Sequence, residues 1–227
     1  IYGNHVGSWN FAATAYLNRW KVKIYYEHYF DDHSQMFFQY GRWKDGHIGL
    51  EITFPKNRFI DTFVYEGLGT KDQTGPMLYD SFWGEFEEQI SAKDNYYNHY
   101  LYQGWQHWGM GIGNPLLPGP IYNKNGQITF ISNRVLAHHI GFCGSPCQSL
   151  SYRMLLSYSR HWGTYDNPLN EIKKQFNSLF EVTYAPQQLK GWSFTVSGAM
   201  DRGNLLGNNY GGMLVIRKQG IIKSGNK

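Results

Sequence analysis

Residues 149–160, SLSYRMLLSYSR, carry the pattern that decides the fold class. Every second residue is apolar or aromatic, and the residues between them are mostly polar. A period of two residues is typical of a β-strand, because successive side chains of a strand point to opposite faces of its sheet. The stretch therefore predicts a strand with one apolar face and one polar face. The apolar series is Leu150, Tyr152, Met154, Leu156 and Tyr158.

The same alternation recurs along the whole chain and predicts eight to ten strands. The segments run for roughly ten residues, which is the length that a tilted transmembrane strand needs. Short turns alternate with long polar loops, an asymmetry typical of outer-membrane barrels. The other candidate strands are residues 5–17, 20–30, 36–40, 48–54, 58–69, 127–142, 176–184, 192–202 and 210–222. The short turns are residues 18–19, 55–57, 143–148 and 185–191. The long loops are residues 31–47, 70–126, 161–175 and 202–209, and Phe82, Phe86 and Ile90 within them have the spacing of a short helix.

The polar face of these strands separates two all-β architectures. It carries Ser, Thr, Asn, Glu and Arg side chains, which suit a water-filled lumen and do not suit the core of a soluble β-sandwich. Aromatic residues also gather near the strand ends, as they do in membrane-interface girdles. We therefore predict an antiparallel transmembrane β-barrel. The aromatic residues in question are Trp9, Trp20, Phe59, Tyr158 and Trp192.

The composition of the 227 residues sets further bounds. Aromatic residues make up 18% and charged residues 17%, and the net charge is +4. This charge is too small and too scattered to indicate nucleic-acid binding. No run of 18 or more apolar residues occurs, so no membrane-spanning helix is predicted. We expect residues 1–222 to belong to a single barrel domain and residues 223–227 to form a polar tail.

Cys143 and Cys147 are the two cysteines, in the stretch GFCGSPCQ. The Gly-Ser-Pro between them predicts a tight turn. Cysteines that flank a turn could form a disulfide in an oxidising compartment such as a periplasm, or could remain as free thiols. A zinc site would need two more ligands, and only His138 and His139 lie close in the sequence.

The most aromatic stretch runs from Tyr96 to Leu117, YYNHYLYQGWQHWGMGIGNPLL. Its rings stand among amide and imidazole side chains, and three glycines follow them. This mixture suits a sugar, because a pyranose stacks its C–H face on a ring while its hydroxyls need donors and acceptors. A packed loop or an interface belt would have the same composition.

The residues do not form a recognisable catalytic set. His138 and His139 are adjacent on a predicted strand, so they face opposite ways and cannot act on one substrate. There is no G-x-S-x-G motif, and Glu66, Asp72 and Asp201 look isolated in the sequence. The GMGIG stretch has no preceding strand and no following helix, so it does not predict a dinucleotide site. We expect no enzyme activity and no cofactor.

Several ordered blocks carry a family resemblance. They are YYEHYFDDHSQM, WKDGHIGLEI, YEGLGTKDQTGP, DNYYNHYLYQGWQHWGMGIGNPLL, ISNRVLAHHIGFCG and LLSYSRHWGTY. Together they resemble the Wzi-type capsule-assembly family of outer-membrane proteins, in its Bacteroides-like branch. The resemblance implies a Gram-negative outer-membrane barrel that binds capsular polysaccharide through its outer face, without catalysis. It also implies that this chain is roughly the C-terminal half of such a barrel.

The binding hypothesis points to ten residues in the long loops and at the rim. Its partners would be a surface polysaccharide and outer-membrane lipid, and the alternative is a porin-like or transport barrel for small solutes. Arg134 would meet an acidic sugar, and Trp162 and Tyr165 would lie in the loop after residue 160. The candidates are Tyr96, Tyr97, Trp105, His107, Trp108, Asp72, Gln73, Arg134, Trp162 and Tyr165.

Overall fold

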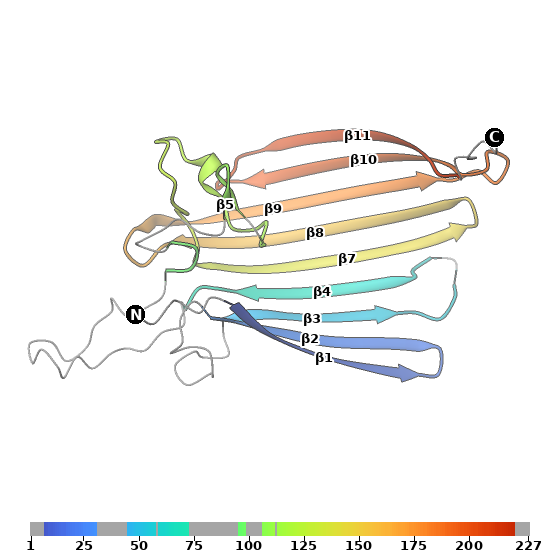
Figure 1. Ribbon diagram of the computed structural model, residues 1–227, viewed down its shortest axis with the longest axis horizontal. Helices are drawn as coiled ribbons and strands as arrows, with labels where there is room; N and C mark the ends of the chain where they lie inside the picture. Colours follow the sequence, from blue (N-terminus) through green and yellow to red (C-terminus); the bar gives the residue numbers. More distant parts are fainter. Residues whose placement is uncertain are drawn as a thin grey trace, which may run out of the picture.

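The protein is all-β, and one antiparallel sheet of nine strands dominates it (Figure 1). The computed structural model describes residues 7–30, 45–57, 59–72, 95–98, 106–111 and 113–220. The order in the sheet follows the chain, and only the step from β4 to β7 passes over the small hairpin of β5 and β6. The bounds are β1 Gly7–Leu17, β2 Trp20–Phe30, β3 Gly46–Thr53, β4 Thr62–Gly69, β5 Gln106–His107, β6 Met110–Gly111, β7 Val135–Cys147, β8 Leu150–Gly163, β9 Pro168–Tyr184, β10 Trp192–Gly203 and β11 Asn209–Lys218.

The helical content of the described residues is one 3₁₀ turn, η3, at Pro120–Tyr122. No helix in this part of the chain is long and apolar enough to cross a membrane. The candidate strand at residues 36–40 and the candidate helix around Phe86 lie outside the described residues.

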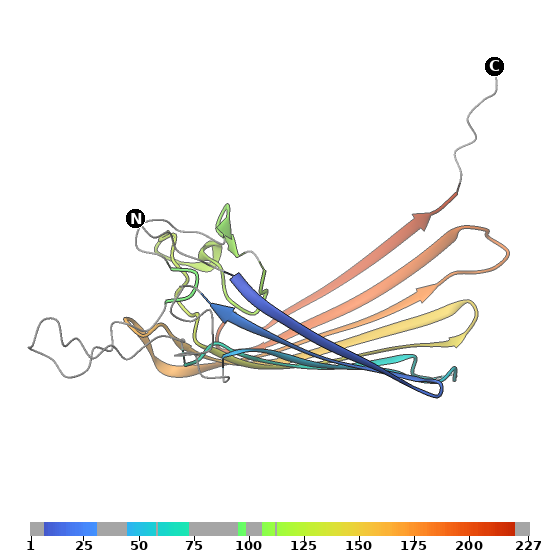
Figure 2. The same ribbon diagram turned by 60° about the horizontal axis from the view of Figure 1, so that its bottom comes forward.

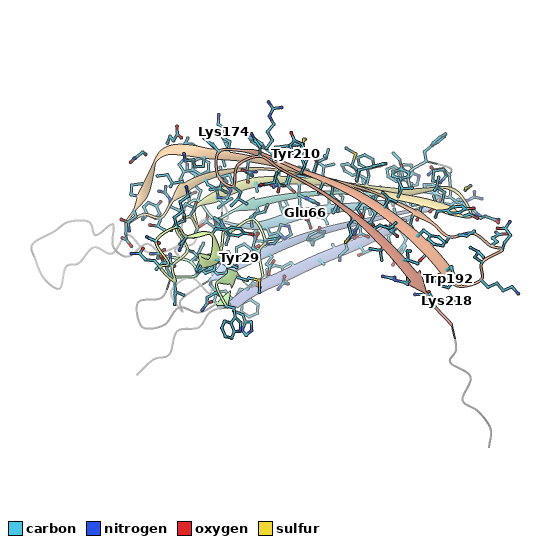
Figure 3. All side chains as sticks on the ribbon, turned by 90° about the horizontal axis from the view of Figure 1, so that it is seen from above. Tyr29, Glu66, Lys174, Trp192, Tyr210 and Lys218 are labelled. Carbon is cyan, nitrogen blue, oxygen red and sulfur yellow. The ribbon has the colours of Figure 1, made fainter. Side chains whose placement is uncertain are left out.

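The sheet is curved (Figure 2), and the strand register gives it the two different faces that the alternation predicted. The strand register places one apolar series side by side across the sheet, for example Ile140 of β7 opposite Leu156 of β8. This series forms the convex face, where Figure 3 labels Tyr210 and Lys174. The polar series forms the concave face, where Figure 3 labels Glu66 and Tyr29.

The two ends of the sheet also differ. At one end, which we call the turn end, short connections such as Asn18-Arg19 join neighbouring strands. Asn18 has φ 55°, a conformation that two-residue hairpin turns require and that Asn tolerates. At the other end, the loop end, the long connections leave the sheet, and residues 113–133 lie over its concave side (Figures 1 and 2). The connections after β2 and β4 are long, as predicted, whereas those after β8 and β10 span only residues 164–167 and 204–208 and are no longer than the turn-end connections at residues 54–61 and 185–191.

The predicted strand at residues 127–142 is wrong in its first half, since β7 begins only at Val135. Amide side chains bind the backbone of the preceding segment in place of a neighbouring strand. Asn98 accepts a hydrogen bond from the Phe130 N–H and donates one to its carbonyl, both at 2.8 Å. Asn123 donates to the carbonyls of Gln127 and Thr129 at 2.6 and 2.7 Å.

The predicted long loop at residues 161–175 is also wrong. β8 continues to Gly163 and β9 starts at Pro168, so Trp162 is a strand residue and only residues 164–167 form the loop. Thr164 closes this tight connection by accepting a hydrogen bond of 2.9 Å from the Asn167 N–H. A proline is tolerated as the first residue of a strand. The polar sequence of the strand ends led to the expectation of a loop.

The two cysteines lie on one strand. Cys143 pairs with Arg153 and Cys147 pairs with Leu150, so the turn is at residues 148–149 and not between the cysteines. The register shift between Gly144 and Cys147 is a β-bulge. The two sulfurs are not bonded to each other.

The apolar core is small and sits at the loop end. Its buried side chains come from the concave face of the sheet and from the segment before β7. Tyr29, Tyr97 and Leu116 pack against it from the side. The core therefore fixes residues 113–133 against the sheet, while β1 and β11 stay exposed along most of their length. The core residues are Leu68, Leu117, Phe130, Val135 and Ala137.

Candidate functional site

The structure places eight of the ten candidate residues, in three groups at the loop end. Tyr96 and Tyr97 line a cavity on the concave side, and His107 and Trp108 belong to the hairpin of β5 and β6. Four more gather where β4, β7 and β8 end at the loop end. These four are Asp72, Arg134, Trp162 and Tyr165, whereas Gln73 and Trp105 lie outside the described residues.

The cavity has a volume of about 700 Å³ and lies between the concave face and residues 113–117. The sheet supplies its floor from the inward-facing positions of β1, β2, β3, β4, β7 and β8. Because a single strand contributes only one or two of these side chains, the floor depends on the register of the whole sheet. The side chains of the floor include Ser8, Glu27, Tyr29, His47, Glu66, Leu68, Ala137, His139 and Ser157.

Two carboxylates and an imidazole form a continuous row across this floor. His47 lies between the two acids, with Nδ1 3.8 Å from a Glu27 oxygen and Nε2 3.5 Å from a Glu66 oxygen. Ser8 donates a hydrogen bond of 2.7 Å to Glu27, and Tyr25 donates one to Glu66. Glu66 is therefore not the isolated acid that the sequence indicated. Carboxylate oxygens in such a row accept hydrogen bonds from hydroxyl groups.

The wall opposite the floor is aromatic. Tyr96 is 5% exposed, and its hydroxyl donates a hydrogen bond of 3.2 Å to the Asp45 carboxylate. The Tyr97 ring packs on Phe130 with 4.9 Å between the ring centroids. Tyr97 has φ 69°, which is uncommon for a residue with a side chain and must be held by its surroundings. Tyr96 is thus a buried anchor, and Tyr97 orients the wall.

The hairpin of β5 and β6 presents a tryptophan to solvent. Trp108 is 84% exposed and forms its two-residue turn with Gly109, with φ 53° and 79°. Positive φ at both positions is typical of a type I′ turn. The Gly109 N–H donates to Gln106 Oε1 at 2.8 Å, and the Ile121 N–H donates to the Gly109 carbonyl at 2.8 Å. The His107 ring stands at 86° to the indole. The ring is therefore exposed on a fixed support.

A cluster of cationic and aromatic side chains lies at the loop end of the central strands β4, β7 and β8. The Arg134 guanidinium lies 3.9 Å from the centroid of the Tyr165 ring, and its Nε donates to the Lys71 carbonyl at 3.0 Å. The Tyr165 hydroxyl donates to the Asp72 carbonyl at 3.2 Å. Lys71 Nζ lies 5.2 Å from the centroid of Trp162. Cations over ring faces are attracted by the ring quadrupole.

Burial raises the pKa of the Tyr165 phenol above its ordinary value, against the opposing effect of the Arg134 guanidinium. The phenol therefore stays protonated at neutral pH and keeps its hydrogen bond to Asp72. The ring that supports Arg134 is neutral under the same conditions.

The two adjacent histidines point to opposite faces, as predicted. His139 faces the cavity and shares a hydrogen bond of 2.7 Å with Ser157. His138 faces outward, where the Tyr65 hydroxyl lies 2.8 Å from its Nδ1. Among the described residues no group of His, Cys, Asp and Glu side chains is arranged to hold a metal ion.

Sequence reasoning missed the acids and His47 of the floor, and the cations next to Arg134. Alternation assigns Glu27 to the polar face, but only the pairings of Glu27 with His47 and of Gly49 with Glu66 bring the acids together. Lys71 and Lys174 lie in stretches that were assigned to loops, whereas Arg160 is the last residue of a predicted strand. No protein family, curated protein or solved structure matches this chain.

Proposed function

We propose that this chain forms the wall of a β-barrel in the Gram-negative outer membrane. Its loop end would bind surface polysaccharide and hold it at the cell without catalysing a reaction. This is the capsule-tethering role that the resemblance in sequence implies. The barrel is supported by the two faces of the sheet, and the tether is supported by one ring, Trp108.

The convex face offers a continuous apolar surface that no other part of the described chain covers. Soluble proteins rarely expose an apolar patch that spans many strands. A hydrocarbon layer would cover such a surface, as it does in outer-membrane barrels. Outward-facing side chains that are 37–65% exposed include Phe11, Ile24, Ile48, Ile140, Phe180, Val196, Leu214 and Ile216.

The concave face supports a wet lumen. Its polar side chains bind one another across neighbouring strands. Arg153 lies 3.3 Å from Glu181, and Asn177 donates a hydrogen bond of 2.7 Å to Asp201. In lipid the open edges of β1 and β11 would leave backbone groups without partners, so the barrel is completed by further strands.

The observation that carries the tether is the exposed indole of Trp108 on its fixed hairpin. A non-glycine residue held at positive φ is a common sign of a functional constraint. A flat ring that is 84% exposed can stack on a pyranose without losing conformational freedom. One such contact contributes about 1 kcal/mol. A polymer that meets many copies of the protein would gain retention by avidity.

The test compares two tryptophan variants of the complete protein in its native cell. Trp108→Ala removes the ring at the loop end, and Trp192→Ala removes a ring at the turn end as a matched control. Barrel levels are equalised, and cell-bound polysaccharide is measured against shed polysaccharide. We expect shedding in Trp108→Ala alone.

Equal retention in both variants, with shedding in a deletion strain, would refute the role of Trp108. The proposal that the protein holds polysaccharide at the cell would then still stand. Retention in the deletion strain would refute the tether itself. In that case, ion conductance by the protein in planar bilayers would support a porin-like barrel.

A further inference from the structure

The convex face changes its chemistry toward the loop end. Ile140 and Leu156 are paired in the apolar part of the face. Two residues further up, Tyr158 pairs with Phe176, and Phe176 pairs with Arg202 on its other side. This row has the mixture of aromatic and cationic side chains that is typical of a membrane interface.

Above that row the outward positions become cationic. Arg160 of β8 is paired directly with Lys174 of β9. One row higher, the Trp162 N–H donates a hydrogen bond to the Arg134 carbonyl, and Lys71 lies beside the Trp162 ring. Successive rows are about 7 Å apart along a strand. We call Lys71, Arg134, Arg160, Lys174 and Arg202 the rim cations.

The pairing of Arg160 with Lys174 disfavours the fold of the isolated chain. Like charges that lie directly opposite each other on one face of a sheet repel. Arg160 leans on the Trp162 ring, 5.4 Å from its centroid, which does not neutralise it. Lys174 is exposed, and Figure 3 shows it on the convex side.

The rim cations differ from the cations of the concave face in their acidic partners. In the part of the chain that the structure describes, no carboxylate forms an ion pair with a rim cation. Cations of the concave face differ, because Arg153 pairs with Glu181 and Lys173 pairs with Glu171 at 2.6 Å. Among the described residues, therefore, the rim cations have no carboxylate partner in an ion pair, and an anionic ligand would neutralise them.

We propose that the rim cations bind the phosphate groups of phosphorylated glycolipid in the outer leaflet of the membrane. This inference rests on the proposed barrel, which places Arg202 in the aromatic row and the other four rim cations about 7–14 Å above it, at the depth of lipid head groups. Arginine matches phosphate oxygens with two parallel hydrogen bonds, and lysine adds a mobile charge. The indole of Trp162 lies among three of these cations, in the same row as Arg134.

The experiment uses the complete protein in phosphatidylcholine nanodiscs that contain rough lipopolysaccharide or the same glycolipid after enzymatic removal of its phosphates. Bound glycolipid is counted by native mass spectrometry at several salt concentrations. The rim variant is Arg160→Gln with Lys174→Gln. The matched control is Lys190→Gln with Lys218→Gln, which removes the same charge at the turn end. Electrophoretic mobility with and without heating reports folding of each variant.

We expect the wild type and the control to bind the phosphorylated glycolipid equally. The rim variant should bind about 25-fold more weakly, since each surface cation contributes about fivefold. The dephosphorylated glycolipid should bind weakly to all three proteins. Equal binding by the rim variant, or equal binding of the dephosphorylated glycolipid, would overturn the inference. Displacement of the glycolipid by a soluble acidic polysaccharide would also overturn it and assign the rim to polysaccharide. A protein that does not insert into the discs would refute the barrel, whereas failure at the rim alone leaves the barrel intact.

Discussion

Replacing Ala13 of β1 by arginine places a charge on the convex face, halfway along a strand. Its neighbour Ala12 faces the concave side, and both alanines are exposed in the sheet. Ala13 pairs with Ile24, and Ala12 pairs with Tyr25. The two variants Ala13→Arg and Ala12→Arg therefore introduce the same side chain into the same strand and differ only in the face that receives it.

The expected difference in stability between the two variants follows from the depth of Ala13 in the apolar layer. Trp9 and Leu17 lie on the same face as Ala13, each four residues away. Four residues of strand span about 13 Å, or about 10 Å of depth at the usual tilt of a barrel strand. In the proposed barrel, Ala13 would therefore lie near the middle of the apolar band, where an arginine costs about 2–4 kcal/mol. Ala12→Arg reaches the wet lumen and should change the free energy of unfolding by about 0.5 kcal/mol at most.

The assay folds the complete protein into phosphatidylcholine vesicles and measures guanidinium unfolding by electrophoretic mobility. We expect a lower free energy of unfolding for Ala13→Arg only. In a soluble protein both positions would tolerate arginine. Equal effects of the two variants would therefore refute the assignment of the convex face to lipid.

Two further predictions concern the turn end. Asn57→Ala should lower the free energy of unfolding by about 1–3 kcal/mol, because the Asn57 amide donates to the carbonyls of Pro55 and Ile60 and accepts from the N–H groups of Phe59 and Ile60. Asn57→Asp keeps the two accepted bonds and should cost about half as much; an equal cost would contradict the role of the donors. Gly144→Ala should cost about 1–3 kcal/mol in the same assay, because a Cβ there would lie 1.7 Å from the Phe59 carbonyl oxygen. Gly198→Ala is the control, since nothing lies within 4 Å of its Cβ, and an equal loss in both variants would contradict this packing argument.

Alternation alone was enough to predict the antiparallel strands and the face on which each side chain lies. It succeeded where one face is uniformly apolar, as in the series from Leu150 to Tyr158. It failed at the loop end, where β8 and β9 continue past the apolar region and both faces become polar. There, Lys173 and Lys174 have the composition of a loop although their backbones are paired in the sheet.

The candidate site was harder to predict because it depends on contacts between distant segments. The row of Glu27, His47 and Glu66 exists only through the register of β2, β3 and β4. The hydrogen bonds between the Asn98 side chain and the Phe130 backbone join residues that are 32 positions apart in the sequence. Periodicity reports which face a residue occupies, and it does not report which residues become neighbours across strands.

The packing of residues 113–133 against the concave face bears on whether the proposed barrel would let solutes pass. Leu117 and Phe130 are 3% and 1% exposed against the concave face. Lifting the segment out of the lumen would expose both side chains, at about 1.5–3 kcal/mol each. An opened conformation would then be populated in about one molecule in two hundred to about one in thirty thousand. If the sheet closes into the proposed barrel, this segment would act as a fixed stopper and not as a gate, and many copies of the protein would leave the membrane closed to small solutes.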